Sequence, residues 1–113
     1  MEIKAGDVVL AKFYFTNSKA YKHRPVLALK DNLPFNDFVA IPISSQISDL
    51  QQDEYLINTT HFSIGDIPKE SKIMLRKTFV VAKHAIVKKY GSISQKAFGD
   101  YHSLFCKYFS CCS

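Results

Sequence analysis

The sequence contains no long hydrophobic run and only three cysteines, and both shortages narrow the class of protein. Cys106, Cys111 and Cys112 all stand close to the C-terminus. One tail cannot supply a framework of disulfides across a domain, so a reducing cytosol is the expected compartment. No segment reaches the roughly 18 uninterrupted apolar residues of a membrane span, and the first residues lack the apolar core of a signal peptide. We therefore expect a cytoplasmic protein that does not bind a membrane.

Signature motifs of several enzyme classes are also missing. The chain has no Gly-x-Ser-x-Gly, no glycine-rich phosphate loop and no His-Glu-x-x-His. These absences argue against a serine esterase, a phosphate-loop nucleotide-binding protein and a zinc hydrolase of those types. His102 precedes Cys106 by four positions, which is too little pattern for a zinc site. We expect neither a metal nor another cofactor.

The composition is that of one basic, ordered domain. The chain has 113 residues, 47% of them hydrophobic, and residues 1–113 are expected to form a single domain. A net charge of +5 favours a polyanionic partner, although many small basic domains bind no nucleic acid. Arg24 and Arg76 are the only arginines. They stand out because a guanidinium grips phosphate with two hydrogen bonds.

Residue patterns predict a mainly β protein. A β-branched and aromatic run predicts a first strand at residues 7–15, followed by a polar loop at 16–23. Two apolar runs on either side of a polar turn at 31–37 predict the next two strands, with Pro42 at an edge, a bulge or a bend. Further strands are predicted at 54–57 and 71–81. Residues 58–65 are ambiguous, and residues 83–89 fit a short helix or a strand.

The last part of the chain carries the clearest helical pattern. Ser92 and Gln95 have the spacing of a capping box. An apolar stripe at spacings of three and four follows, typical of core packing: Ala97, Phe98, Tyr101, Leu104, Phe105, Tyr108 and Phe109. Short strands with one terminal helix predict a small, strongly bent antiparallel sheet or barrel closed by that helix.

Polar residues gather at the ends of the second and third predicted strands. Lys22, His23 and Arg24 precede one strand, and Ser44, Ser45 and Gln46 end the other. If the strands pair antiparallel, the start of one lies beside the end of the other. We therefore expect Arg24 and Ser44 to meet at one edge of the sheet.

This set of residues suits cleavage of a phosphodiester in RNA. The ribose 2′-hydroxyl can attack the adjacent phosphate, so the protein need only position groups, transfer protons and neutralise charge. Arg24 can stabilise the five-coordinate phosphorane, and His23 can exchange protons near neutral pH. Ser44 and Gln46 can hydrogen-bond the phosphate oxygens. In the alternative interpretation, Arg24 is an ordinary surface cation and His23 is a solvated loop residue. Ser44 and Ser45 then merely terminate a strand.

Three segments in this order and spacing resemble the MazF/PemK family of bacterial toxins. They read Gly6-Asp7-Val8-Val9-Leu10, Arg24-Pro25-Val26-Leu27 and Ile43-Ser44-Ser45-Gln46. The family's usual form is Gly-Asp-Ile-Val, Lys-x-Arg-Pro-x-x-Val and a Thr-Ser after a hydrophobic strand. The resemblance covers roughly the first half of the chain.

The resemblance implies an SH3-like barrel, usually homodimeric, that cuts single-stranded RNA such as mRNA without metal. It also implies inactivation by a cognate antitoxin, whose acidic segment the basic toxin would complement. Arg24 matches the family's catalytic arginine, and Ser44 matches its catalytic threonine, keeping the hydroxyl. Lys22 occupies a basic position common in the family, whereas His23 matches no fixed position of it. From their place at the strand ends, Lys22, His23, Ser45 and Gln46 are expected to contact RNA.

The second half departs from the family. Many relatives carry Arg-x-Asp or Glu-Gln-x-Arg-Thr in the strand predicted at 71–81, where this chain has Met74, Arg76, Phe79 and Val80. The acidic partner is missing, and Arg76 is expected only as a phosphate contact. A barrel that binds RNA or protein without cutting is therefore the alternative. Another branch of the fold poisons DNA gyrase through a C-terminal tryptophan, which this chain lacks.

Overall fold

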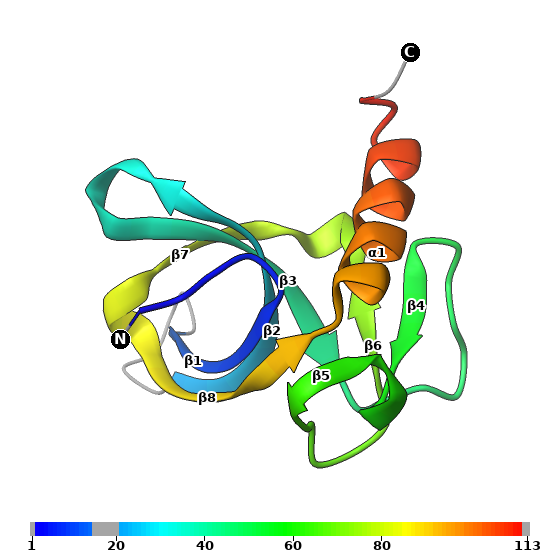
Figure 1. Cartoon of the computed structure of the whole chain (residues 1–113), viewed down its shortest axis with the longest axis horizontal. Helices are drawn as coiled ribbons and strands as arrows, with labels where there is room; N and C mark the ends of the chain where they lie inside the picture. Colours follow the sequence, from blue (N-terminus) through cyan, green and yellow to red (C-terminus); the bar gives the residue numbers. More distant parts are fainter. Residues whose placement is uncertain (1, 15–20, 112–113) are drawn as a thin grey trace.

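The computed structural model describes residues 2–14 and 21–111, and it shows antiparallel strands curled into a half-barrel beside a C-terminal helix (Figure 1). Seven strands follow the order β4-β6-β3-β2-β1-β8-β5, and β7 pairs with β3 outside this path. The strands are β1 (Asp7–Tyr14), β2 (Tyr21–Leu33), β3 (Asp37–Ser44), β4 (Glu54–Ile57), β5 (Phe62–Gly65), β6 (Ser71–Met74), β7 (Phe79–Ala82) and β8 (Ile86–Ile93), and the helix is α1 (Gln95–Tyr108). The predicted fold class, a small antiparallel barrel closed by a terminal helix, is confirmed.

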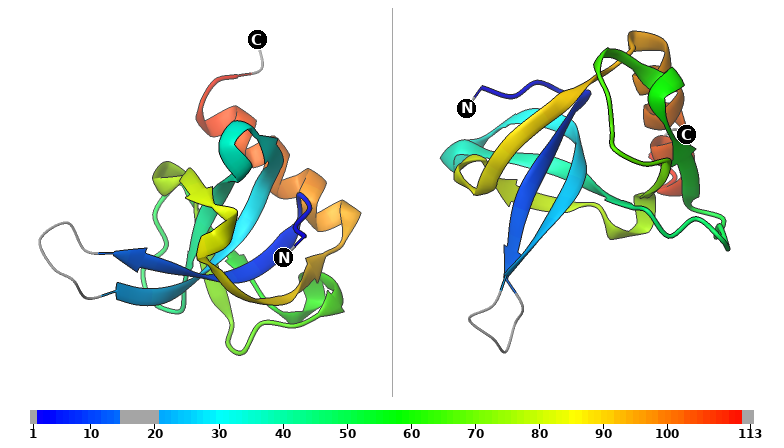
Figure 2. Two further views of the ribbon diagram at one scale, coloured as in Figure 1. Left: turned by 90° about the vertical axis from the view of Figure 1, so that its left-hand side faces the viewer. Right: turned by 90° about the horizontal axis from the view of Figure 1, so that it is seen from below.

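The middle segments of β2 and β3 are apolar because each of their faces packs against a different core. Leu27 and Ile41 belong to a cluster that also contains Ala97 and Tyr101 of α1. The neighbouring residues Val26 and Ala40 belong to a second cluster, which contains Phe38 and Val81. Side chains alternate between the faces of a strand, so consecutive apolar residues supply both cores. The helix therefore covers one face, and the curl of the sheet encloses the other (Figure 2).

Pro42 lies where β3 changes partners. On one side β3 pairs with β2 over most of its length, including Val26 opposite Pro42. On its other side, residues 37–40 pair with β7, whereas Ile43 and Ser44 pair with β6. Pro42 falls between these two partners, where it has no N–H to offer to either. Of the predicted edge, bulge or bend, the structure shows a gap in the ladder on one side of β3, between its partners β7 and β6.

The single strand predicted at residues 71–81 is wrong. The segment forms β6 and β7, separated by a 3-10 turn, Leu75–Lys77. Asp53 holds this turn, because its carboxylate accepts the Arg76 backbone N–H at 2.8 Å and its carbonyl accepts the Leu75 N–H at 3.1 Å. A long-range hydrogen-bond partner thus interrupts a pattern that is locally compatible with a strand.

The predicted loop at 16–23 is wrong at its C-terminal end. Tyr21–His23 belong to β2 and pair with β1, with Lys12 opposite His23. Residues 16–20 lie outside the described part of the chain, as does Phe15 of the first predicted strand. The two ambiguous segments each combine a 3-10 turn with a strand: Thr59–His61 precedes β5, and Lys83–Ala85 precedes β8.

The predicted helix forms, but its cap is not the predicted one. Ser94 is the N-cap, and its hydroxyl accepts the Ala97 N–H at 3.1 Å. Ser92 lies in β8, where its hydroxyl donates to Asp7 at 2.6 Å. The predicted Ser92–Gln95 capping box is therefore wrong by two residues.

Most of the predicted apolar stripe packs against the core, although Tyr108 and Phe109 stay exposed. The Tyr101 hydroxyl donates to the Leu56 carbonyl at 2.6 Å and ties the helix to β4. No helix in the described residues combines the length and apolar character needed to cross a membrane.

Candidate RNA-binding and cleavage site

The polar residues predicted at the two strand ends line one pocket of about 810 Å³. All six contribute to it: Lys22, His23, Arg24, Ser44, Ser45 and Gln46. The antiparallel pairing of β2 with β3 brings them together. The last β2–β3 pair at this end is Val26 with Pro42, so Arg24 and Ser44 each lie two residues beyond it. The expected meeting of the two strand ends is confirmed.

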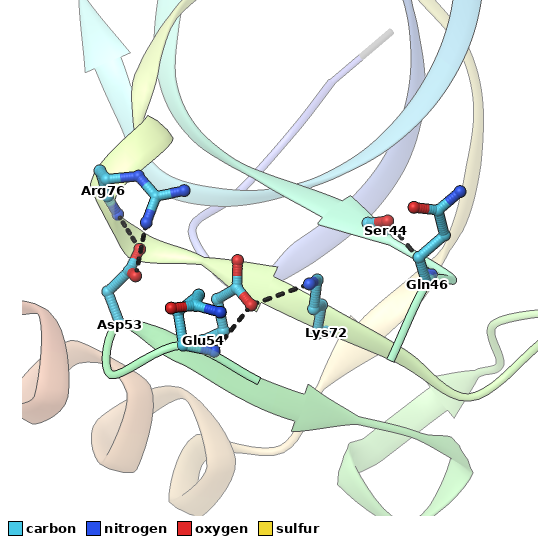
Figure 3. A network of polar contacts seen from close by, with 7 residues as sticks. Ser44, Gln46, Asp53, Glu54, Lys72 and Arg76 are labelled. Atoms are coloured by element: carbon cyan, nitrogen blue, oxygen red, sulfur yellow. Dashed lines mark hydrogen bonds and ion pairs between the residues drawn. The ribbon is translucent and has the colours of Figure 1, made fainter. Parts of the chain in front are cut away.

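Arg24 and Ser44 present their reactive groups differently. Arg24 is exposed, at a point where β2 pairs with β1. Ser44 is half-buried at the end of β3, and its Oγ accepts the Gln46 backbone N–H at 3.2 Å (Figure 3). A hydroxyl that already accepts a hydrogen bond keeps its own proton for donation. Ser44 can therefore donate to an oxygen of a bound anion.

The lining of this pocket is strongly cationic. Lys22, Arg24, Lys69, Lys72 and Lys77 all contribute to it. Glu54 is the only carboxylate among the described residues that line it. With His23 neutral, five cations and one anion give a local charge of 5 − 1 = +4. A cleft dominated by one sign of charge attracts and concentrates ligands of the other sign.

Glu54 is buried and tied to Lys72. The Lys72 ammonium lies 2.8 Å from Glu54 Oε1, and the Gln51 backbone N–H donates to the same oxygen at 3.0 Å (Figure 3). These two hydrogen bonds, the one from Lys72 foremost, lower the pKa of Glu54 from its ordinary value of 4.5. Glu54 therefore stays ionised near neutral pH, and the pair remains a true ion pair.

Arg76 lies outside the lining of the pocket. Its guanidinium donates to Asp53 at 3.0 Å, and its backbone N–H donates to the other oxygen of the same carboxylate. Asp53 is buried, whereas about half of the Arg76 side chain is exposed. The carboxylate that pairs with Arg76 comes from 23 positions earlier in the sequence, and it too lies outside the pocket lining. A contact between Arg76 and RNA stays a prediction.

Sequence reasoning missed four charged residues of the pocket: Glu54, Lys69, Lys72 and Lys77. In the sequence, Glu54 only begins a short predicted strand, and no motif distinguishes the three lysines from the other cations of the chain. The pairing of β6 with β3 brings Lys72 opposite Ser44, and no local pattern reveals that pairing. Lys72 is the second residue of β6, next to Ser71, and this position carries no signal of its own.

A family model for the PemK-like, MazF-like toxin of type II toxin–antitoxin systems matches residues 4–109. The chain belongs to this family. The predicted recognition, made from three short segments in the first half, is confirmed, and the match extends through the second half of this PemK/MazF-like protein.

Solved structures of similar fold include toxin MazF-mt6 of Mycobacterium tuberculosis, at 14% identity and a TM-score of 0.69, with 92% of this chain and 96% of that one covered. A mycobacterial endoribonuclease solved with its cognate antitoxin is also similar, at 11% identity and a TM-score of 0.69, with 96% and 93% covered. At such identities the likeness shows the fold alone. No curated protein has a significant sequence match.

Proposed function

We propose that this protein is a toxin endoribonuclease that cuts single-stranded RNA, such as mRNA, at short sequences without a metal ion. The observation that carries the proposal is the position of Arg24 and Ser44 in one cationic pocket. Membership of a toxin family and the fold shared with a mycobacterial endoribonuclease support it.

The proposed reaction uses the RNA's own nucleophile. A bond forms between the ribose 2′-oxygen and phosphorus, and the bond from phosphorus to the 5′-oxygen breaks. The 2′-hydroxyl loses its proton to a base, and the departing 5′-oxygen takes up a proton. The products end in a 2′,3′-cyclic phosphate and a 5′-hydroxyl.

Each predicted residue has a role in this reaction. Arg24 neutralises the charge that develops on the phosphorane, and Ser44 donates a hydrogen bond to a phosphate oxygen. His23, which lines the same pocket, is the candidate for proton transfer. Lys22, Ser45 and Gln46 hold the RNA beside these groups, and Arg76 is proposed as a contact farther along the strand.

Substitution of the two central residues tests the proposal. Wild type, Arg24→Ala and Ser44→Ala are incubated with a long single-stranded RNA in EDTA, and the 5′ ends are mapped. We expect the wild type to cut at a short sequence and Arg24→Ala to be slower by roughly 10²-fold to 10³-fold, because one preorganised charge donor is lost. Cleavage by Arg24→Ala at the wild-type rate would contradict the proposed role.

A barrel that binds RNA or protein without cutting it is the second candidate. The observation that favours it is the engagement of Arg76 with Asp53, outside the pocket. This candidate predicts retarded RNA and no cleavage by the wild type under any condition. Loss of a real cleavage activity in Arg24→Ala would exclude it.

We also propose a cytoplasmic homodimer that a cognate antitoxin holds inactive. The pocket charge of +4 complements an acidic antitoxin segment, and one similar structure is a complex of an endoribonuclease with its antitoxin. Light scattering tests the dimer, because the expected mass is about twice the 12.9 kDa of one chain. A monomer under all conditions would contradict it.

A further inference from the structure

Lys72 brings a third strand to the pocket that Arg24 and Ser44 line. Ser44 of β3 pairs directly with Lys72 of β6. On the other side of β3, the last pair with β2 is Val26 with Pro42, and Arg24 and Ser44 each lie two residues beyond that pair. Directly opposite residues of antiparallel strands share a face of the sheet. The Ser44 hydroxyl and the Lys72 ammonium therefore stand on one face of neighbouring strands, and the Arg24 guanidinium lines the same pocket from β2.

Glu54 fixes the position of the Lys72 ammonium. It exposes only 4% of its side chain, and Lys72 exposes 12%. The Gln51 N–H anchors the carboxylate oxygen that Lys72 contacts, so the acceptor is itself held in place. Figure 3 shows Lys72 between Glu54 and the end of β3 that carries Ser44. An ammonium has three donors, and the contact with Glu54 takes one of them.

A purely structural ion pair is the competing interpretation. Buried pairs contribute little net stability, because desolvation of both charges offsets their attraction. Such a pair also has no need to line a pocket or to stand opposite Ser44. The Lys96–Asp100 pair of α1 offers a direct comparison, since Lys96 is 87% exposed and does not line the pocket.

We propose that Lys72 binds the scissile phosphate from the side of Ser44 opposite Arg24, and that Glu54 is the positioning residue that aims its ammonium. This inference rests on the proposed cleavage of RNA. In it, Lys72 donates to a non-bridging phosphate oxygen, and no covalent bond to the lysine forms or breaks. The phosphate is held between two cations, and the phosphorane is stabilised from both sides.

The test compares Lys72→Met, Glu54→Gln, the double variant of both, and Lys96→Met as the matched control for the loss of one paired lysine. Two quantities are measured: the single-turnover cleavage rate at saturating protein, and the slope of log binding constant against log salt concentration. We expect Lys72→Met to cut about 10²-fold more slowly and to reduce the slope by about 0.7, the value of one phosphate contact. We expect Lys96→Met to change neither quantity.

The other two variants distinguish a hydrogen bond donated by a positioned Lys72 ammonium from the effect of the overall positive charge of the pocket. The double variant keeps the net charge of the pocket, so a pure field effect predicts wild-type cleavage, whereas an aimed Lys72 predicts slow cleavage. Glu54→Gln adds one positive charge to the pocket and is expected to bind RNA more tightly while cutting it more slowly. If Glu54 had only a structural role, its substitution would not produce tighter RNA binding together with slower cleavage.

Wild-type cleavage by a folded Lys72→Met or double variant would overturn the inference. If Lys72→Met does not fold, because Glu54 is left without its cation, the double variant decides. If Arg24→Ala loses activity and the double variant keeps full activity, the role of Lys72 is rejected, and the proposed cleavage of RNA stands. RNA left uncut by the wild type would reject the proposed function and this inference with it.

Discussion

At the scale of single residues, the pocket combines an exposed reactive group with a buried ion pair. Arg24 is exposed and can reach a ligand, whereas Glu54 is almost fully enclosed with Lys72 beside it. Hydrogen bonds from Lys72 and from the Gln51 backbone lower the pKa of Glu54 from 4.5. A carboxyl that is more acidic in the folded than in the unfolded chain links the stability of the fold to pH.

The sign of this linkage gives a prediction. Because the pKa of Glu54 is lowered on folding, its contribution to stability is fully present above about pH 4.5, and it is lost as the pH falls through the lower folded value. Urea unfolding of wild type and Glu54→Gln is therefore compared between pH 7 and pH 3. We expect the difference in unfolding free energy to shrink below about pH 4.5. If the difference in unfolding free energy between wild type and Glu54→Gln stayed constant or grew below about pH 4.5, the Glu54–Lys72 ion pair would be contradicted.

Arg24 and Ser44 could be found from the sequence, whereas Glu54 and Lys72 could not. The first two stand at the ends of consecutive strands joined by a short turn, so pairing of neighbours brings them together. Lys72 contacts Glu54 from 18 positions away, and it faces Ser44 only because β6 pairs with β3. Contacts between strands that are distant in the chain leave no local pattern.

At the scale of elements, Asp53 and Ser94 set boundaries that periodicity missed. The residues from β6 to β7 are compatible with one strand, and the hydrogen bonds of Asp53 to the turn Leu75–Lys77 divide them. Two serines precede the helix, and pairing of β8 with β1 retains Ser92 in the strand. The earlier serine was predicted as the cap because Gln95 completed a capping-box spacing. Because the pairing of β8 with β1 cannot be read from the local sequence, the sequence does not reveal that Ser94 is the cap.

The capping assignment predicts which serine stabilises the helix. Replacing Ser94 with Ala leaves the Ala97 N–H without its side-chain acceptor and is expected to cost about 1 kcal/mol of unfolding free energy. Ser94→Asp keeps an acceptor and serves as the control, with stability close to that of the wild type. Chemical denaturation measures both variants. Equal losses in the two would argue against a capping role for Ser94.

At the scale of the whole molecule, the positive charge is concentrated where the strand ends meet. The protein carries a net charge of +5, and the described lining of the pocket alone carries +4 from five cations and Glu54. The terminal helix packs on the cluster that contains Leu27 and Ile41. Arg24 lies three positions before Leu27 in β2 and therefore on the opposite face of the strand. The middle of β2 and β3 thus supports the core under the helix, and the same two strands carry the predicted phosphate-binding groups at the pocket.

This charge distribution predicts a steep dependence of RNA binding on salt. If each of the five pocket cations pairs with one phosphate, the slope of log binding constant against log salt concentration is about −3.5 for single-stranded RNA. Binding of a non-cleavable RNA by Arg24→Ala, which retains four of the five, is expected to give a slope shallower by about 0.7. Wild-type binding with a slope near zero would show that phosphates are not the groups recognised.

The most direct test of the central claim replaces one hydroxyl group of the RNA with hydrogen. After the cut site is mapped, the nucleotide on the 5′ side of the scissile phosphate is changed to its 2′-deoxy form, and both RNAs are incubated with wild type in EDTA. Attack by the ribose hydroxyl predicts that the all-ribose RNA is cut to a 2′,3′-cyclic phosphate and a 5′-hydroxyl, and that the 2′-deoxy position stays intact. Cleavage at the 2′-deoxy position, or cleavage only after a divalent metal is added, would contradict the proposed chemistry of Arg24 and Ser44.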